Sequence, residues 1–167
     1  MKIYTIIAGV NGVGKSSFFG VLCGIRSDVG NVIDESQINS SIEKGINFTQ
    51  ETTLSGSKTL RTIKQAREHD YYIRLYYIGV NSAQESIKRI SNRVEKGGHD
   101  IPTEDVLRRY NKRLDDLIAV LPYCNEVKLY DNENGFVEKA EYKNGMLIIK
   151  GNNITDWLKE LQNKLEN

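Results

Sequence analysis

The chain has 167 residues, and its 23 Lys and Arg residues nearly balance its 22 Asp and Glu residues, so the net charge at pH 7 is +1. This balance argues against a protein that coats nucleic acid or binds membranes through a polybasic segment. No apolar run approaches the roughly 20 residues that span a bilayer, and the 2 cysteines and 2 histidines are too few and too scattered for a zinc site. We therefore expect a globular protein with reduced thiols in the cytoplasm.

The first half of the chain alternates between strand-like and helix-like patterns. Residues 2–8 form an isoleucine-rich run, which predicts a buried parallel strand and not a signal peptide, because glycine-rich sequence follows it without a cleavage site. A helix is expected over 15–24. The segments after it predict a short strand at Val32–Ile33, a helix over 37–44, a strand over 46–51 with Ile46 and Phe48 on one side, and a helix over 57–69.

The second half continues this alternation. Residues 71–80 are aromatic and β-branched throughout, which is typical of a strand. The remaining predicted elements are a helix over 83–96, a helix over 104–121 with Thr103 as its N-cap and Leu107, Tyr110, Leu114, Leu117 and Leu121 facing inward, a strand over 126–131, a hairpin that turns at Asn144–Gly145, and a closing helix over 155–165.

Strands that alternate with helices predict an α/β fold. We expect a three-layer α/β/α arrangement around a mainly parallel central sheet, with a C-terminal β-hairpin and a closing helix. One domain is expected over residues 1–167, in which residues 85–113 form a helical lid and residues 126–150 form the C-terminal strands and hairpin.

The most specific motif is Gly9-Val10-Asn11-Gly12-Val13-Gly14-Lys15-Ser16. It matches the P-loop pattern G-x-x-x-x-G-K-[ST] in full, between a predicted strand and a predicted helix. Its glycines let backbone N–H groups surround a phosphate, and the helix N-terminus adds positive charge. The motif therefore predicts a P-loop NTPase fold that binds ATP or GTP. The predicted nucleotide-binding residues are Gly9, Asn11, Gly12, Val13, Gly14, Lys15, Ser16 and Ser17. Lys15 is expected to contact the β- and γ-phosphates and Ser16 to bind Mg²⁺, while Ser17 either completes the set or only caps the helix.

Acidic residues follow the second and third predicted strands. In an open α/β sheet the chemistry lies beyond the carboxyl ends of the strands, which is where Asp34 and Glu51 stand. A carboxylate there can accept a proton from a substrate hydroxyl or hold a Mg²⁺-bound water, or it can simply stabilise a helix N-terminus. The segment Glu51–Gly56 is dense in hydrogen-bonding groups, which suits a polyol or sugar ligand but also suits a helix cap.

Eight basic residues lie between Lys88 and Arg113. Arg89 and Arg93 are four residues apart, so two like charges share one helix face. Arg108 and Arg109 stand near the start of the next helix, where the dipole disfavours them. Both arrangements indicate an anionic partner and predict that Arg93, Arg108 and Arg109 clamp a transferring phosphate. The alternative is a solvated helix pair in which Asp105 pairs with Arg109.

Taken together, the P-loop, the segment Phe48–Gly56 and the stretch Arg89–Tyr110 resemble the zeta-toxin-like P-loop kinases, in the branch of predicted ATPases. The resemblance covers most of residues 3–135. It implies a phosphotransferase that uses ATP or GTP and Mg²⁺, since zeta toxins phosphorylate the 3′-hydroxyl of UDP-N-acetylglucosamine. It implies the P-loop roles for Lys15 and Ser16, a substrate-binding Glu-x-Thr element at Glu51 and Thr53, and lid arginines at Arg93 and Arg108 or Arg109. It also raises an antitoxin protein as a partner.

The chain departs from the family pattern at two positions. The aspartate that serves as the family's base falls at Ser36, so either Asp34 has taken that role or the base is weakened. Ser55 stands where the toxins carry an arginine. A small-molecule kinase is the leading hypothesis, with a P-loop ATPase or a degenerate nucleotide-binding regulatory module without phosphotransfer as the alternatives. Near-neutral charge disfavours a nucleic-acid acceptor.

Overall fold

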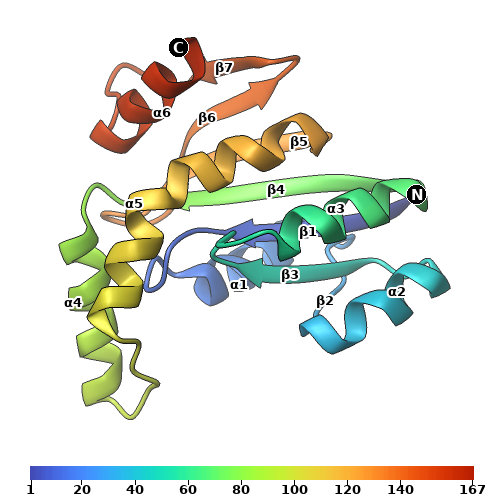
Figure 1. Cartoon of the computed structure of the whole chain (residues 1–167), viewed down its shortest axis with the longest axis horizontal. Helices are drawn as coiled ribbons and strands as arrows, with labels where there is room; N and C mark the ends of the chain where they lie inside the picture. Colours follow the sequence, from blue (N-terminus) through green and yellow to red (C-terminus); the bar gives the residue numbers. More distant parts are fainter.

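The structure is a computed structural model that describes residues 1–167, and it contains one seven-stranded sheet in the order β2-β3-β1-β4-β5-β6-β7 (Figure 1). The strands are β1 (Lys2–Ala8), β2 (Asn31–Val32), β3 (Phe48–Thr52), β4 (Tyr71–Gly79), β5 (Glu126–Asp131), β6 (Val137–Lys143) and β7 (Met146–Ile149). The first five of these pair in parallel, and β6 and β7 add in antiparallel fashion.

The helices are α1 (Lys15–Ile25), α2 (Ile38–Lys44), α3 (Lys58–Glu68), α4 (Ala83–Glu95), α5 (Thr103–Val120) and α6 (Asp156–Glu166), with short 3₁₀ turns at Glu35–Gln37 (η1) and Leu121–Tyr123 (η2). The predicted three-layer α/β/α fold with a mainly parallel sheet, a C-terminal hairpin and a closing helix is confirmed. No helix is both long and apolar enough to span a membrane.

Two apolar cores lie on opposite faces of the sheet. The larger one packs under α2, α3, α5 and α6 and includes Ile6 of β1 and Leu75 of β4. The smaller one packs under α1 and includes the neighbouring residues Ile7 and Tyr76. Successive side chains of a strand point to opposite faces, so these central strands are buried on both sides. This explains why their sequences are almost continuously apolar.

Local details differ from the predictions where the pattern alone was ambiguous. The strand β3 begins at Phe48, and Ile46 lies before it with half of its surface exposed. Pro102 occupies the N-cap position of α5, so Thr103 is the first helical residue and not the cap. Leu107 is 37% exposed, whereas its neighbour Val106 is buried. Both positions are spaced so that they could lie on the buried face of α5 with Leu114 and Leu117. In the structure α5 packs with Val106 on that face.

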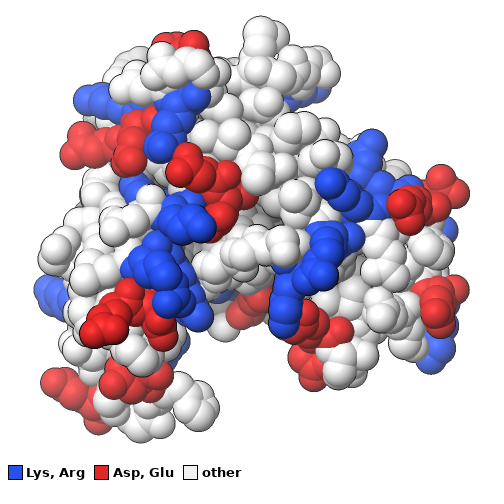
Figure 2. Space-filling model, viewed as in Figure 1, with Lys and Arg blue, Asp and Glu red and all other residues white.

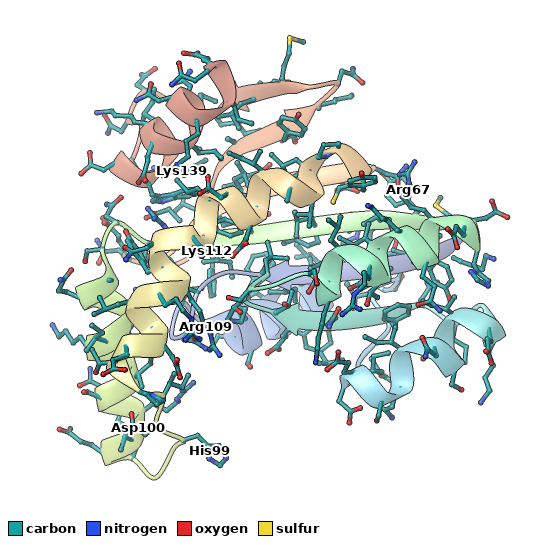
Figure 3. The ribbon with its side chains drawn as sticks, in the orientation of Figure 1. Arg67, His99, Asp100, Arg109, Lys112 and Lys139 are labelled. Carbon is teal, nitrogen blue, oxygen red and sulfur yellow. The ribbon has the colours of Figure 1, made fainter.

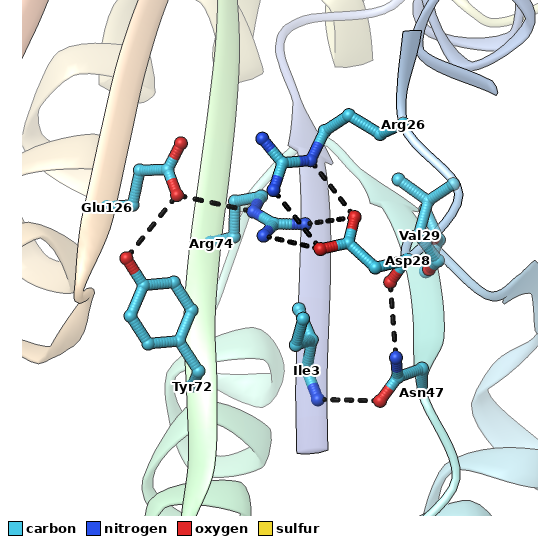
Figure 4. Close-up of polar contacts among 9 residues, drawn as sticks. Ile3, Arg26, Asp28, Val29, Asn47, Tyr72, Arg74 and Glu126 are labelled. Carbon is cyan, nitrogen blue, oxygen red and sulfur yellow. Dashed lines mark hydrogen bonds and ion pairs between the residues drawn. The ribbon is translucent and has the colours of Figure 1, made fainter. Parts of the chain in front are cut away.

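An ion-pair network around the buried Arg74 ties the loop after α1 to the sheet (Figure 4). Arg74 of β4 is 3% exposed, and its guanidinium donates to both carboxylate oxygens of Asp28 at 3.1 Å and to Glu126 of β5 at 3.3 Å. Arg26 donates to the same Asp28 carboxylate at 3.0 and 3.1 Å. Hydrogen bonds from Arg26 and Arg74 hold the pKa of Asp28 well below its usual range.

The Asp28→Asn variant is expected to unfold more easily by about 2 kcal/mol at pH 7, because buried Arg74 loses its main carboxylate partner. A lowered folded-state pKa contributes stability above the unfolded-state pKa of about 4, and this contribution is lost as the pH falls further. The difference between wild type and variant should therefore shrink on acidification. Urea unfolding at about pH 7 and about pH 3 measures it, and equal stabilities at pH 7 would contradict this role.

Candidate functional site

The glycine-rich loop curls at the carboxyl end of β1, directly before α1 (Figure 1). A Cβ on Gly9 would lie 2.6 Å from the carbonyl oxygen of Ile78, so the close approach of β4 excludes any side chain there. Gly12 and Gly14 have φ values of 81° and 99°, which favour glycine. Gly14 is the N-cap of α1 and offers no side-chain cap. The first N–H groups of α1 are therefore left without a capping side chain.

A cavity of about 410 Å³ opens over the N-terminus of α1. No hydrophobic side chain lines it, and its walls are Asn11, Gly12, Gly14, Lys15, Ser16, Ser17, Glu51, Arg89 and Arg93. The loop supplies most of this wall, while β3 supplies the glutamate and α4 supplies the two arginines. A helix N-terminus together with a lysine and two arginines makes this cavity suited to an anion.

The side chain of Lys15 folds back over the loop. Its ammonium donates to the carbonyl oxygens of Gly9 at 2.8 Å and Val10 at 3.2 Å. The pKa of Lys15 is lowered to about 8: burial lowers it most, the charge of Glu51 raises it, and the charges of Arg109 and Arg93 lower it. The lysine is therefore positioned at the phosphate cavity but holds its proton weakly until an anion arrives.

Ser16 and Glu51 meet at the edge of the cavity. The Ser16 hydroxyl donates to the Glu51 carboxylate at 3.0 Å. Glu51 reaches this place because β3 runs parallel to β1, with Glu51 opposite Ile7. A hydroxyl and a carboxylate are hard oxygen ligands of the kind that Mg²⁺ accepts, usually only one or two from the protein. No cluster of three or more His, Cys, Asp or Glu side chains could hold a metal, so phosphate oxygens and water would complete the coordination.

The structure separates the three predicted lid arginines. Arg109 donates to the side-chain oxygen of Asn11 at 2.9 Å, and its buried Nε has no partner. Arg93 lines the cavity and donates only to the backbone oxygen of His99, at 3.2 Å. Arg108 is 63% exposed and pairs with Asp105 at 2.8 Å. Arg93 and Arg109 therefore lie at the loop and Arg108 does not, and Asp105 pairs with Arg108 instead of Arg109.

Figures 2 and 3 show how charged side chains are distributed around these elements. Basic and acidic side chains are interspersed over the face in Figure 2. Figure 3 places Arg109 and Lys112 on α5, with Arg109 nearer the start of the helix, whereas His99 and Asp100 lie at the tip of the connection between α4 and α5. The tip residues therefore take no part in the cavity.

Two predicted residues at the strand ends lie outside the cavity. The exposed Asp34 carboxylate caps η1, where it accepts hydrogen bonds from the backbone N–H of Ser36 at 2.9 Å and from the Ser36 hydroxyl. Thr53 donates its hydroxyl to Ser55 at 3.0 Å. In this structure Asp34 therefore acts as a cap, and catalytic and substrate-binding roles for Asp34 and Thr53 stay predictions.

Two further residues at the loop were not among the predicted site residues. In the sequence Arg89 stands out only as a like-charged neighbour of Arg93. In the structure its Nε pairs with Glu85 at 3.0 Å, so a carboxylate already balances the charge of Arg89. The four-residue spacing from Glu85 to Arg89 is the signal that identifies this pair. Asn132, which follows β5, donates to the carbonyl of Val13 at 2.8 Å across 119 residues of sequence. No local pattern could have shown that contact.

The fold and this loop define the class: a P-loop protein with an anion-binding cavity at the carboxyl end of a mainly parallel sheet. A sequence model described as "Zeta toxin" matches residues 25–136, which is more than half of the chain and begins after the P-loop. The chain belongs to the zeta toxin family.

The chain also resembles one curated relative in part of its sequence and two solved structures in fold. An uncharacterized protein of Haemophilus influenzae is 40% identical over 70 residues, which are 42% of this chain and half of that relative's length. The structure of the PezAT chromosomal toxin-antitoxin system of Streptococcus pneumoniae aligns over 99% of this chain and 85% of that chain, with a TM-score of 0.63 and 13% identity. The AvrRxo1-ORF1:AvrRxo1-ORF2 structure with sulphate ions aligns over 99% of this chain and 63% of that chain, also with a TM-score of 0.63 and 13% identity.

Proposed function

We propose that this protein transfers the γ-phosphoryl group of ATP or GTP to a hydroxyl of a small-molecule acceptor. The observation that carries the proposal is the cavity itself, in which Lys15 and the N-terminus of α1 lie beside Arg93 of α4, while Arg109 of α5 contacts the loop at Asn11. A site that only holds a nucleotide needs the loop, whereas phosphoryl transfer also needs charges that stabilise the moving group. Membership of the zeta toxin family supports a nucleotide-dependent kinase.

In this mechanism the chain works mainly by position and charge. Lys15 and the N–H groups at the start of α1 bind the β- and γ-phosphates. Arg93 and Arg109 stabilise the negative charge that develops on the transferring group. Ser16 and Glu51 would hold Mg²⁺, which neutralises phosphate charge when it is bound.

For the acceptor we propose a nucleotide sugar of the UDP-N-acetylglucosamine type, with Glu51 and Thr53 in its binding site, because that is the substrate which the family resemblance implies. Asp34 is the proposed base. Its support is the hydrogen bond from Ser36, which puts the Asp34 carboxylate next to the position where the family carries its base. Both bonds from Ser36 end on Oδ1, which leaves Oδ2 of Asp34 for a substrate proton.

A second candidate function is nucleotide binding without transfer. It is favoured by the serine at position 36 and by the use of Asp34 as a helix cap. Tight binding of ATP with neither hydrolysis nor transfer would support this regulatory module over the kinase.

The deciding experiment is ³¹P NMR of the protein with Mg²⁺, ATP and UDP-N-acetylglucosamine, beside the Lys15→Ala variant. A new phosphomonoester signal that is absent with the variant would establish the kinase and its substrate class. Free phosphate alone would indicate an ATPase or a different acceptor. The Ser36→Asp variant is then the next protein to assay, because it restores the family's base.

An antitoxin-like protein is the partner that we propose. The support comes from the two structures of similar fold. One is from a toxin-antitoxin system, and the other is AvrRxo1-ORF1:AvrRxo1-ORF2. Growth arrest on expression of the wild type, relieved by the Lys15→Ala substitution, is the expected result. Unaffected growth would count against a toxin.

The affinity for ATP is expected to fall as the pH rises above about 8. Phosphates favour charged Lys15, whose pKa in the free protein is about 8, so above this pH binding must take up a proton. The dissociation constant should then rise by up to about tenfold per pH unit. Calorimetry at about pH 9 in two buffers of different ionisation enthalpy measures the proton uptake. A constant affinity across this range would contradict the assignment, and the Lys15→Met variant should show no such dependence.

A further inference from the structure

Two side chains from distant parts of the chain hold one carbonyl of the P-loop. The Val13 oxygen accepts hydrogen bonds from the Asn132 amide at 2.8 Å and from Nη1 of Arg89 at 3.3 Å. Arg89 also donates through Nη2 to the backbone carbonyl of Asn132 and through Nε to Glu85 at 3.0 Å. We call Arg89 and Asn132, with the bond between them, the Val13 clamp.

The direction of this carbonyl determines the direction of the next N–H. In a planar trans peptide the C=O of one residue and the N–H of the next point to opposite sides. Because the clamp holds the Val13 oxygen on the side of Asn132, the Gly14 N–H points to the other side, and Gly14 lines the phosphate cavity. That N–H donates to no backbone carbonyl, so it is free for an anion.

Gly14 needs such a constraint because it has no side chain. Glycine reaches both signs of φ at little cost, so a peptide beside glycine rotates easily unless something holds it. The packing around Gly14 is also tight: a Cβ there would lie 3.0 Å from the Asn132 amide nitrogen and 3.4 Å from the Phe136 ring, so these side chains would have to shift. Gly14 therefore allows the sharp turn of the loop but also allows the Val13–Gly14 peptide to rotate. The Val13 clamp opposes this rotation.

Arg89 differs from the arginines that face the phosphate. Its Nε and both terminal nitrogens already have protein partners, and one of these partners is the Glu85 carboxylate. Arg93, one turn later, donates only to a backbone carbonyl. Although both line the cavity, Arg93 can turn to a ligand at the loss of one bond, whereas Arg89 would have to abandon three partners.

We propose that Arg89 and Asn132 are positioning residues, which orient the Gly14 N–H toward the phosphates of the nucleotide. The proposal rests on nucleotide binding at the P-loop, which is part of the proposed function. Backbone N–H groups bind phosphate well only when they already converge on it before binding. The clamp supplies this order from outside the loop, through segments that lie far away in the sequence.

The test compares Arg89→Met, Asn132→Ala and the double variant with two controls. Lys88→Met removes the exposed basic neighbour on the same helix, and Asn134→Ala removes an exposed amide two residues beyond the clamp. Titration with a fluorescent ATP analogue and Mg²⁺ gives the dissociation constants. Each clamp variant should weaken binding by about tenfold. The double variant should be close to the weaker single variant, because both contacts act through one carbonyl. The controls should stay within about twofold of wild type.

The ¹H–¹⁵N resonance of Gly14 separates positioning from general stability. In the nucleotide-free protein the clamp variants should shift or broaden this resonance while the melting temperature changes little, and Arg89→Lys should restore only part of the affinity, since a lysine cannot reach three partners. Unchanged affinities, multiplicative losses in the double variant, or an unperturbed Gly14 resonance would overturn the proposal. The wild type could also be folded and bind no nucleotide, while its Gly14 resonance still responds to the clamp variants. That result would contradict the proposed nucleotide binding, and the clamp would then have no phosphate to orient the Gly14 N–H toward.

Discussion

Replacement of Lys15 by methionine is expected to slow phosphotransfer by about 10³-fold while the protein stays folded. The lysine is the one ammonium that folds over the loop, where it donates only to the carbonyl oxygens of Gly9 and Val10. Once phosphates are bound, it supplies positive charge where negative charge grows in the transition state. The methionine side chain is unbranched and nearly as long as that of lysine but carries no charge. The expected loss is therefore one of catalysis and phosphate binding.

The assay is the rate of ATP-dependent phosphorylation under saturating Mg²⁺, read by ³¹P NMR or by a coupled detection of ADP. Lys44→Met is the matched control, since Lys44 is exposed at the end of α2. The melting temperature of the Lys15 variant should equal or exceed that of wild type, because the substitution removes an ammonium whose burial is unfavourable. A variant that retains wild-type turnover would refute the role of the loop in catalysis.

Replacement of Glu51 by glutamine is expected to slow phosphotransfer by about 10²-fold with little effect on the affinity for nucleotide. Glutamine has the same shape and can still accept from Ser16, but it carries no charge for Mg²⁺ and cannot accept a proton. The effect should therefore appear in turnover, because the loop and Lys15 are expected to hold the phosphates without Glu51.

Two further measurements on this variant tell what Glu51 does. A higher Mg²⁺ concentration for half-maximal activity would assign it to the metal, as its contact with Ser16 predicts. A higher KM for the acceptor at unchanged Mg²⁺ dependence would assign it to the substrate, as the family resemblance implies. Glu43→Gln, an exposed glutamate on α2, is the control. Wild-type turnover in the Glu51 variant would exclude both roles.

The family and fold followed from the sequence because their signals are local. The P-loop is a run of consecutive residues whose glycines are needed by its own backbone, as the φ values of Gly12 and Gly14 show. The hairpin turn is equally local, since Asn144 and Gly145 take the positive φ values of a type I′ turn. The apolar run of β1 indicated a buried parallel strand, and the aromatic and β-branched run of β4 indicated a strand.

The sequence could not predict which side chains lie at the site, because the direction of a side chain depends on how its helix packs. Arg108 and Arg109 are adjacent in the sequence, and in a helix successive side chains diverge by about 100°. Only the packing of α5 turns Arg109 toward Asn11, 98 residues away, and turns Arg108 outward to Asp105. For the same reason the sequence could not choose between Leu107 and Val106 for the core.

The sequence by itself thus determined the loop, the order of strands and helices, and the family, since each depends on backbone conformation and short-range pattern. The tertiary structure decided which charges share the cavity. The parallel register of β1 and β3 brings Glu51 to Ser16, and the placement of α4 beside the end of β5 forms the Val13 clamp. Contacts of this kind join residues far apart in the chain, so their partners are set by packing and not by any local preference.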